Sequence, residues 1–295
     1  MKKSLLLLLL TLSLSAKMNI VVSYPYIKDL TQKITQDRAT ITSLAKGSWD
    51  PHFVVPRPSL IVKLRQADLL IINGAQLEIG WLAQLIRQAH NSKITKNSAA
   101  FLNLSQSVTL MNELKGAVSR ADGDIHPDGN PHYILDPYNV VPLANAIAEK
   151  LASLDEKNAE FYFTNADKFI DSWKKKLTLW DKKMAKAHNT KVIQYHELYN
   201  YFFKRYQLQN VINIEPLPGI TPSSRHTFKV IKKIKQEHIK LIFQDIYHSK
   251  KVAKFIASKT DAKILLMPHD VGAIHDVKTL EELFEYLVNQ VSDNV

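Results

Sequence analysis

The sequence contains no cysteine among its 295 residues. This absence excludes a disulfide framework, a zinc site built from thiolates and a cysteine nucleophile. It also leaves no cysteine to carry a lipid, so we expect the mature protein to be free of a lipid anchor. Beyond residue 16, no apolar run approaches the ~20 residues that a membrane-spanning helix needs.

Residues 1–16 form the longest apolar run of the chain. A basic start at residues 1–3 (MKK) precedes a leucine-rich stretch at residues 4–14, and the small residues Ser15 and Ala16 follow. This order predicts a cleavable secretory signal peptide. We therefore expect a periplasmic protein and leave residues 1–16 out of the fold.

The charge balance is strongly basic, with a formal net charge of +11. Loss of Lys2 and Lys3 with the signal peptide leaves +9. The remaining lysines are spread over predicted helix faces and are not interleaved with aromatic residues, as they would be in a nucleic-acid groove. We therefore expect a solvated basic surface and no nucleic-acid partner.

Apolar, β-branched runs alternate with helical periodicities along most of the chain. The predicted strands are residues 18–24, 39–45, 69–72, 101–104, 191–195, 211–214, 241–243 and 264–267. Strands that alternate with helices at this spacing are typical of βαβ units with largely parallel sheets. The sequence thus predicts two similar α/β halves.

Glycine and proline are both absent between Pro142 and Pro216. In this interval the pattern is helical from residue 155 to about residue 186, and four large apolar residues recur at steps of three and four: Trp173, Leu177, Trp180 and Met184. A helix of this length would extend about 45 Å. We expect an N-terminal lobe at residues 17–154, a rigid connecting helix at 155–187 and a C-terminal lobe at 188–295.

Four potential metal ligands follow predicted strands. His52 comes after the second strand, His132 after the fourth, His196 after the fifth and Asp270 after the last. Ligands of parallel sheets bind at the carboxyl ends of the strands, so these side chains should face a cleft between the lobes. Three imidazoles and one carboxylate suit Zn²⁺, with Mn²⁺ less favoured.

Two histidines near this set leave alternatives open. His269 competes with Asp270, because adjacent residues after a strand point in different directions. His126, in the polar loop at residues 123–139, either assists the ligands or hydrogen-bonds within its loop. The other histidines lie in helices, at helix ends or in surface contexts and are interpreted as structural: His90, His188, His226, His238, His248 and His275.

Several short motifs run through the mature chain in a fixed order. They are residues 49–52 (WDPH), 57–59 (RPS), 67–69 (ADL), 74–78 (GAQLE), 81–82 (WL), 130–137 (NPHYILDP), 195–196 (YH) and 201–202 (YF). Together they resemble the zinc- or manganese-binding solute-binding proteins of bacterial ABC transporters. The resemblance implies two α/β lobes joined by a long helix and metal held between them by His52, His132, His196 and Asp270. It also implies delivery to an inner-membrane permease by a monomer that is not an enzyme.

The chain departs from this family in informative ways. Manganese-selective members often carry glutamate at the position of His196, so the histidine favours zinc. Residues 122–130 are at most a short remnant of the histidine- and acid-rich loop of zinc-specific members. The segment at residues 268–272 (PHDVG) also differs from the expected serine–aspartate form, which makes Glu215 an alternative fourth ligand.

The competing hypotheses are a secreted zinc-dependent hydrolase and a manganese-binding receptor of the same fold. The sequence contains neither an HExxH helix motif nor a Gly-x-Ser-x-Gly nucleophile elbow. Nor does an obvious general base lie close in sequence to the predicted ligands. These observations favour binding over hydrolysis.

Overall fold

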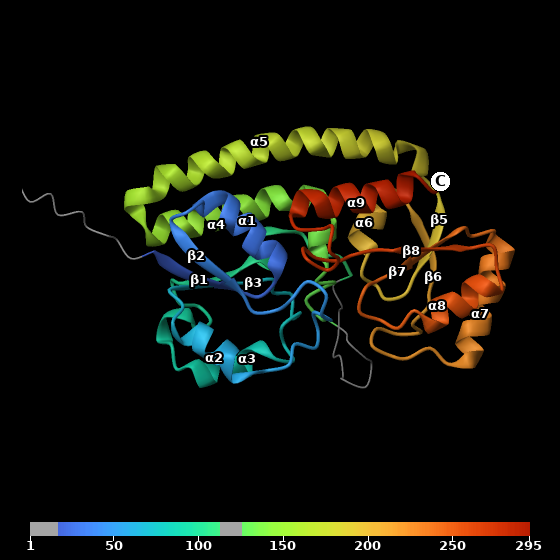
Figure 1. Ribbon diagram of the computed structural model, residues 1–295, viewed down its shortest axis with the longest axis horizontal. Helices are drawn as coiled ribbons and strands as arrows, with labels where there is room; N and C mark the ends of the chain where they lie inside the picture. The colour runs from blue at the N-terminus through green and yellow to red at the C-terminus, as the bar shows by residue number, and fades with distance from the viewer. Residues whose placement is uncertain (1–16, 113–125) are drawn as a thin grey trace, which may run out of the picture.

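The structure is a computed structural model that describes residues 17–112 and 126–295 (Figure 1). The predicted signal peptide and the start of the polar loop, through residue 125, lie outside the described residues. Within the described ranges, no helix combines the length and apolar character needed to cross a membrane.

Two four-stranded sheets form the framework, and all of their strands run parallel. The first sheet has the order β2-β1-β3-β4, with β1 (Met18–Val22), β2 (Ala39–Ser43), β3 (Leu69–Ile72) and β4 (Phe101–Asn103). The second has the order β6-β5-β7-β8, with β5 (Lys191–Gln194), β6 (Gln209–Asn213), β7 (Leu241–Gln244) and β8 (Lys263–Leu266). The prediction of two parallel α/β halves is therefore confirmed.

The middle residues of the central strands are apolar because both faces of each sheet are covered. Val21 on β1 pairs with Leu70 on β3, and Ile193 on β5 pairs with Ile242 on β7. All four side chains are fully buried. Continuous burial of this kind is usual for parallel strands that have helices on both faces.

Helices flank the sheets on both sides (Figure 1). They are α1 (Pro25–Thr35), α2 (Pro58–Arg65), α3 (Leu82–Ala89), α4 (Val140–Leu154), α6 (Asn200–Arg205), α7 (Ser224–Glu237) and α8 (Lys251–Ser258). α1 and α4 pack with the long helix, while α2 and α3 pack together on the opposite face of the first sheet (Figure 1).

The apolar residues of segment 77–89 recur at helical spacing, which predicts one helix, but α3 begins only at Leu82. The preceding segment is wound into turns, with positive φ angles of 48° at Ala75 and 62° at Gln76. These turns bring the Glu78 carboxylate back to β3, where it accepts hydrogen bonds from Asn73 N (2.7 Å) and Gly74 N (3.1 Å). The apolar periodicity continues through the turns, which is why it suggested a longer helix.

The long helix α5 extends from Ala159 to Met184, with short 3₁₀ turns at Glu156–Asn158 and Ala185–Ala187. Its 26 residues measure about 39 Å at the usual rise per residue. In Figure 1 it lies along one edge of the molecule and passes both sheets. The long helix is confirmed, while the exact lobe boundaries at residues 154 and 187 stay predictions.

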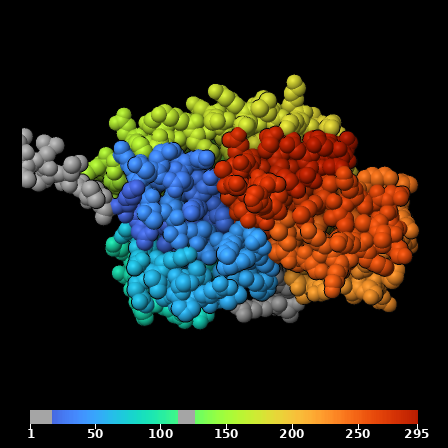
Figure 2. Space-filling model, viewed as in Figure 1, coloured from blue at the N-terminus to red at the C-terminus, as the bar shows by residue number. Residues whose placement is uncertain are grey.

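The C-terminal helix α9 (Leu280–Ser292) packs against α5 and α1. Its first backbone amide, Leu280 N, donates to Asp29 on α1 at 3.0 Å, and the Phe284 ring lies 5.5 Å from the Trp180 ring on α5. Figure 2 shows this red segment directly against the blue N-terminal one. Helix α9 therefore covers the apolar face of α5 and also contacts α1.

Candidate metal centre

Three of the four predicted ligands lie together. His52, His132 and His196 each offer a ring nitrogen, and these atoms all lie within 4.8 Å of one another. The ring centroids are separated by 5.2 Å, 5.3 Å and 5.5 Å. Imidazoles that share one tetrahedral zinc ion at the usual Zn–N distance have centroids roughly 5 Å apart. The spacing of the three rings therefore fits a single ion.

The fold explains how distant residues meet here. His52 lies between β2 and α2, His132 follows β4, and His196 is the second residue after β5. All three side chains are buried. The first sheet thus contributes two histidines and the second sheet one, so the site lies where the two halves face each other.

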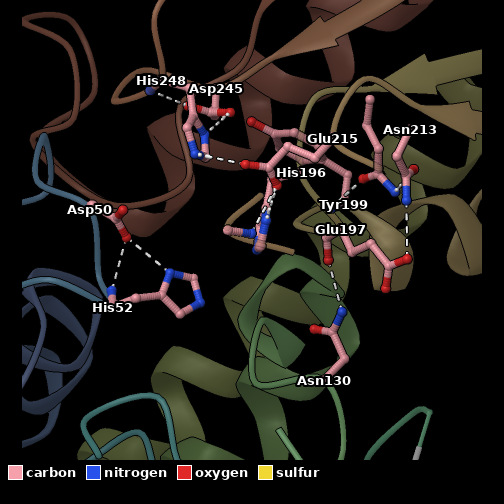
Figure 3. Close-up of polar contacts among 12 residues, drawn as sticks. Asp50, His52, Asn130, His196, Glu197, Tyr199, Asn213, Glu215, Asp245 and His248 are labelled. Atoms are coloured by element: carbon pink, nitrogen blue, oxygen red, sulfur yellow. Dashed lines mark hydrogen bonds and ion pairs between the residues drawn. The ribbon is translucent and has the colours of Figure 1, made fainter. Parts of the chain in front are cut away.

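His52 is oriented by the nearby Asp50. The Asp50 carboxylate lies 2.9 Å from His52 Nδ1 and accepts a hydrogen bond from the His52 backbone amide at 2.9 Å (Figure 3). Burial raises the pKa of Asp50, but the hydrogen bonds and charge of His52 outweigh it and leave the pKa below its ordinary value. His52 Nε2 is buried without a hydrogen-bond partner and is available to a ligand.

His196 is held by a chain of alternating acids and histidines (Figure 3). Its Nδ1 lies 2.8 Å from Glu215 Oε2, and Glu215 Oε1 lies 3.3 Å from His248 Nε2. His248 Nδ1 is in turn 2.9 Å from Asp245. Glu215 therefore supports a site histidine from behind.

Within this series of contacts, each acid or histidine stabilises the charged form of its neighbour. Burial raises the pKa of Glu215, but its hydrogen bonds to His196 and His248 outweigh that effect and bring the pKa to about 2. Burial lowers the pKa of His248, whereas its hydrogen bonds to Asp245 and Glu215 raise it to about 10. His248 is thus an imidazolium between two carboxylates at neutral pH.

His132 sits in the part of the site where the two halves touch. Its backbone amide donates to Asn130 Oδ1 at 2.9 Å, and Asn130 Nδ2 donates to the Glu197 carbonyl oxygen at 2.8 Å. His132 Nε2 is buried without a hydrogen-bond partner. Burial is the main reason that the pKa of His132 lies well below its usual value. The ring is therefore neutral, as a metal ligand must be.

Asp270 does not belong to this cluster. Its Oδ1 accepts hydrogen bonds from Tyr26 N at 2.8 Å and from Val271 N at 2.6 Å. Burial raises the pKa of Asp270 well above its usual range, although these two amides lower it. Among the described residues, only the three histidines form a group with metal-ligand spacing. Metal binding by Asp270 stays a prediction.

The alternative ligand His269 also lies outside the group of three histidines. Its ring packs edge-on against Tyr247, with centroids 5.1 Å apart, and its Nδ1 is buried without a partner. Burial is the main cause that lowers the pKa of His269 to about 4. His269 therefore forms part of the packing beside the site.

His126 lies directly against the cluster. Its ring stacks on His52 at a centroid distance of 5.3 Å and an interplanar angle of 28°. Both of its ring nitrogens are buried without a hydrogen-bond partner, so the side chain makes none of the loop hydrogen bonds that were considered for it. Burial, followed by the charges of His52 and His196, lowers the pKa of His126 to about 3.

Sequence reasoning missed the contribution of His248, which it interpreted as structural. His248 closely follows β7, as His196 follows β5. Its position at a carboxyl strand end was the signal that could have indicated its place beside the site. Asp245, which directly follows β7 and is fully buried, carried the same signal.

Two parallel sheets of the same strand order, with three histidines meeting between them, define a two-lobed binding protein with a metal-type site. The sequence matches the family described as "Zinc-uptake complex component A periplasmic" over residues 20–293. The chain therefore belongs to this family, which confirms the resemblance seen in its motifs.

Two curated relatives illustrate the range of the family. The chain is 25% identical over 259 residues to the high-affinity zinc uptake system protein ZnuA of Bacillus subtilis, covering 84% of this chain and 76% of that protein. It is 27% identical over 252 residues to the manganese ABC transporter substrate-binding lipoprotein PsaA of Streptococcus pneumoniae, covering 84% and 78%. The relatives thus include proteins named for each metal.

Solved structures share the fold. A crystal structure of ZnuA has a TM-score of 0.78 at 24% identity and covers 94% of this chain and 99% of its own. A metal-free periplasmic metal-binding protein from Candidatus Liberibacter asiaticus has a TM-score of 0.77 at 20% identity, with the same coverage.

Proposed function

We propose that the protein is an exported solute-binding protein that captures Zn²⁺ and delivers it to an ABC permease. The observation that carries this proposal is the cluster of three buried histidines at the boundary between the halves. Membership of the zinc-uptake family and the names of the relatives support it. We propose His52, His132 and His196 as ligands, and Asp270 stays a predicted fourth ligand.

The donor set supports zinc over manganese. Imidazole nitrogen suits Zn²⁺, whereas carboxylate and carbonyl oxygens suit Mn²⁺. All three clustered side chains are imidazoles. The carboxylates behind the rings also favour zinc. Asp50 contacts Nδ1 of His52, and Glu215 contacts Nδ1 of His196. A carboxylate in this position fixes the ring and increases the basicity of the other nitrogen.

Capture replaces the water shell of the ion with these nitrogens. The histidines must be neutral to bind, so protonation competes with the metal. His132 is already neutral at ordinary pH because of its burial.

The same proposal covers export and the partner. Residues 1–16 would act as a cleaved signal peptide, and the mature chain, without cysteine, would be a monomer free in the periplasm. Membership of a zinc-uptake family gives no support to a secreted hydrolase.

Metal titration of the purified, metal-free protein tests this function. Competition with a chelator would measure the affinities of the wild type, His132→Ala and the control His275→Ala for Zn²⁺ and Mn²⁺. His275 is a suitable control because it is exposed and, among the described residues, pairs with its neighbour Asp276 alone. We expect His132→Ala to weaken zinc binding by about 100-fold or more, since even supporting residues contribute ~10–100-fold.

His275→Ala should bind zinc as the wild type does, and the wild type should bind zinc more tightly than manganese. Zinc binding by His132→Ala at the affinity of the wild type would disprove the assignment of the site. Tighter binding of manganese would disprove the assignment of the metal.

A further inference from the structure

The net positive charge of the chain is concentrated in one part of the second half. Residues 224–259, which contain α7, β7 and α8, include ten Lys or Arg and two Asp or Glu. Their net charge is therefore +8, compared with +9 for the whole sequence beyond residue 16. Because the remainder is almost neutral, the basic surface expected from the composition is a local one.

The two acids of this segment leave its outer surface basic. Asp245 is fully buried and contacts His248 beside the metal site. Glu237 is the last residue of α7 and already pairs with Lys191 and Lys233. The exposed faces of α7 and α8 thus carry cations without a free carboxylate of their own.

Two exposed aromatic rings lie among these cations. Phe228 on α7 is 60% exposed and Phe255 on α8 is 41% exposed. Their ring centroids are 6.2 Å apart at an interplanar angle of 84°, so the rings meet edge to face between the two helices. The inner faces of α7 and α8 pack on the second sheet, and Figure 1 shows both helices at the outer side of that half, away from α5.

Basic side chains surround the two rings at helical spacing. On each helix, basic residues lie three or four positions from the phenylalanine, so they share its face. Lys259 Nζ lies 5.9 Å from the centroid of the Phe255 ring. We call the following residues the α7–α8 patch: Arg225, Phe228, Lys232, Lys251, Phe255 and Lys259. All six are exposed, and within the described part of the chain its four cations form no ion pair.

The surface of an anionic bilayer fits this combination of groups. Lysine and arginine near such a surface are attracted to the phospholipid headgroups. Exposed phenylalanine rings bind at the boundary between headgroups and acyl chains. The aliphatic stems of lysine can lie in the same boundary while their ammonium groups stay among the headgroups.

Two other occupants fit less well. A second copy of this chain would bring the same positive charge, and like charges across an interface repel. A protein partner usually binds an aromatic anchor in a pocket of its own. Phe228 and Phe255 are packed against each other, so neither ring is free to enter a pocket alone, whereas a fluid bilayer accommodates both.

We propose that the α7–α8 patch binds the surface of an anionic phospholipid bilayer. Its four cations contact the headgroups, and its two rings enter the boundary with the acyl chains. This binding requires no metal. Its use in keeping an exported protein close to the membrane of its permease rests on the proposed function.

Co-sedimentation of the mature protein with vesicles tests the proposal. We expect binding to vesicles of equal parts phosphatidylglycerol and phosphatidylcholine but not to vesicles of phosphatidylcholine alone. Added salt should weaken the binding, because it screens the charges. Lys232→Glu combined with Lys259→Glu should lower the partition coefficient by about 30-fold or more.

The matched control reverses two exposed lysines on α5, Lys174→Glu with Lys175→Glu, and has the same net charge as the patch variant. It should retain most of the binding. Equal losses in the two variants would show that only the net charge matters and would overturn the proposal, as would the absence of binding to anionic vesicles. Zinc affinity should be unchanged in both variants, which verifies that they are folded.

A second pair of variants tests the rings. Phe228→Ser combined with Phe255→Ser should weaken vesicle binding by about 10-fold or more. Phe163→Ser on α5, which removes another exposed phenylalanine, should leave it unchanged. Vesicle binding that does not depend on Phe228 and Phe255, with equally tight binding to soluble polyglutamate, would indicate an acidic protein partner and overturn the proposal.

The same vesicle experiment separates this proposal from the proposed function. His132→Ala should bind anionic vesicles as the wild type does, since the patch acts without the metal. Failure of the metal site would appear as unaltered zinc binding in His132→Ala, whereas failure of the patch would appear in the vesicle assays alone.

Discussion

At the scale of single residues, the protonation state of His248 is set by the groups that its ring contacts. The ring lies between the carboxylates of Asp245 and Glu215, and it stacks on Tyr195 with centroids 4.4 Å apart. Its pKa of about 10 lies above the ordinary value of 6.5, so the folded state favours the protonated form. The interaction stabilises the fold fully between about pH 4.5 and pH 6.5, and it is lost as the pH rises through about 10.

Replacement of His248 by Gln should therefore lower the melting temperature of the metal-free protein near neutral pH. The difference from the wild type should shrink as the pH approaches 10, because the wild-type ring then loses its proton. It should also shrink in acid, as the pH falls from 4.5 toward 2 and Glu215 becomes protonated. Thermal melts across this pH range check the prediction, with His275→Gln as control. A difference that does not vary with pH would contradict it.

The sequence could predict the three clustered histidines because a parallel sheet brings all carboxyl strand ends to one edge. It could not choose among Asp270, His269 and Glu215. Their directions depend on partners far away in the chain, such as Tyr26 for Asp270, which lies 244 positions earlier. His248 was missed for the same reason, since its partner Glu215 lies on a different loop.

At the scale of elements, α5 and α9 show what apolar periodicity can predict about helix packing and what it cannot. The stripe that contains Trp173 and Trp180 was predicted, and both rings are buried. That Phe284 on α9 covers them could not be predicted, because periodicity identifies a buried face but not its partner. The late start of α3 had another cause: positive φ angles at Ala75 and Gln76 leave no mark in an apolar pattern.

Glu285 on α9 supplies the acceptor for the buried indole N–H of Trp180, at 2.8 Å. Glu285→Ala would leave that donor unpartnered and should lower the free energy of unfolding by about 1–3 kcal/mol. Glu285→Gln should recover most of the loss because it retains an acceptor. The matched control is Glu281→Ala, which removes an exposed ion pair with Lys176 and should cost less than about 1 kcal/mol. Denaturant titrations measure all three, and equal losses in both alanine variants would contradict the prediction.

At the scale of the molecule, several connections join the two halves besides the metal site. Arg205 on α6 makes two hydrogen bonds of 2.9 Å to Asp136, and Asp270 bridges to α1. α5 passes both sheets, and α9 packs against it (Figures 1 and 2). Because these contacts hold the halves together, metal exchange should involve small tilts and loop movements rather than wide hinge opening.

Small-angle scattering checks this expectation on the mature protein. The radius of gyration should be the same in the metal-free and zinc-loaded forms, since α5 and α9 restrict the relative motion of the halves. His132→Ala treated with the same zinc concentrations serves as control for effects unrelated to binding. A clear contraction of the wild type on zinc addition, absent from this variant, would show hinge closure instead.

The hydrogen bond between Asp29 and Leu280 joins residues 251 positions apart and has a consequence for biogenesis. A chain that emerges N-terminus first completes its first sheet long before α9 arrives to cover α1 and α5. Until the second sheet begins to emerge, only His52 and His132 of the three clustered histidines have been made. A chain interrupted before residue 196 would lack the third histidine, so firm retention of the ion should require synthesis of the second half.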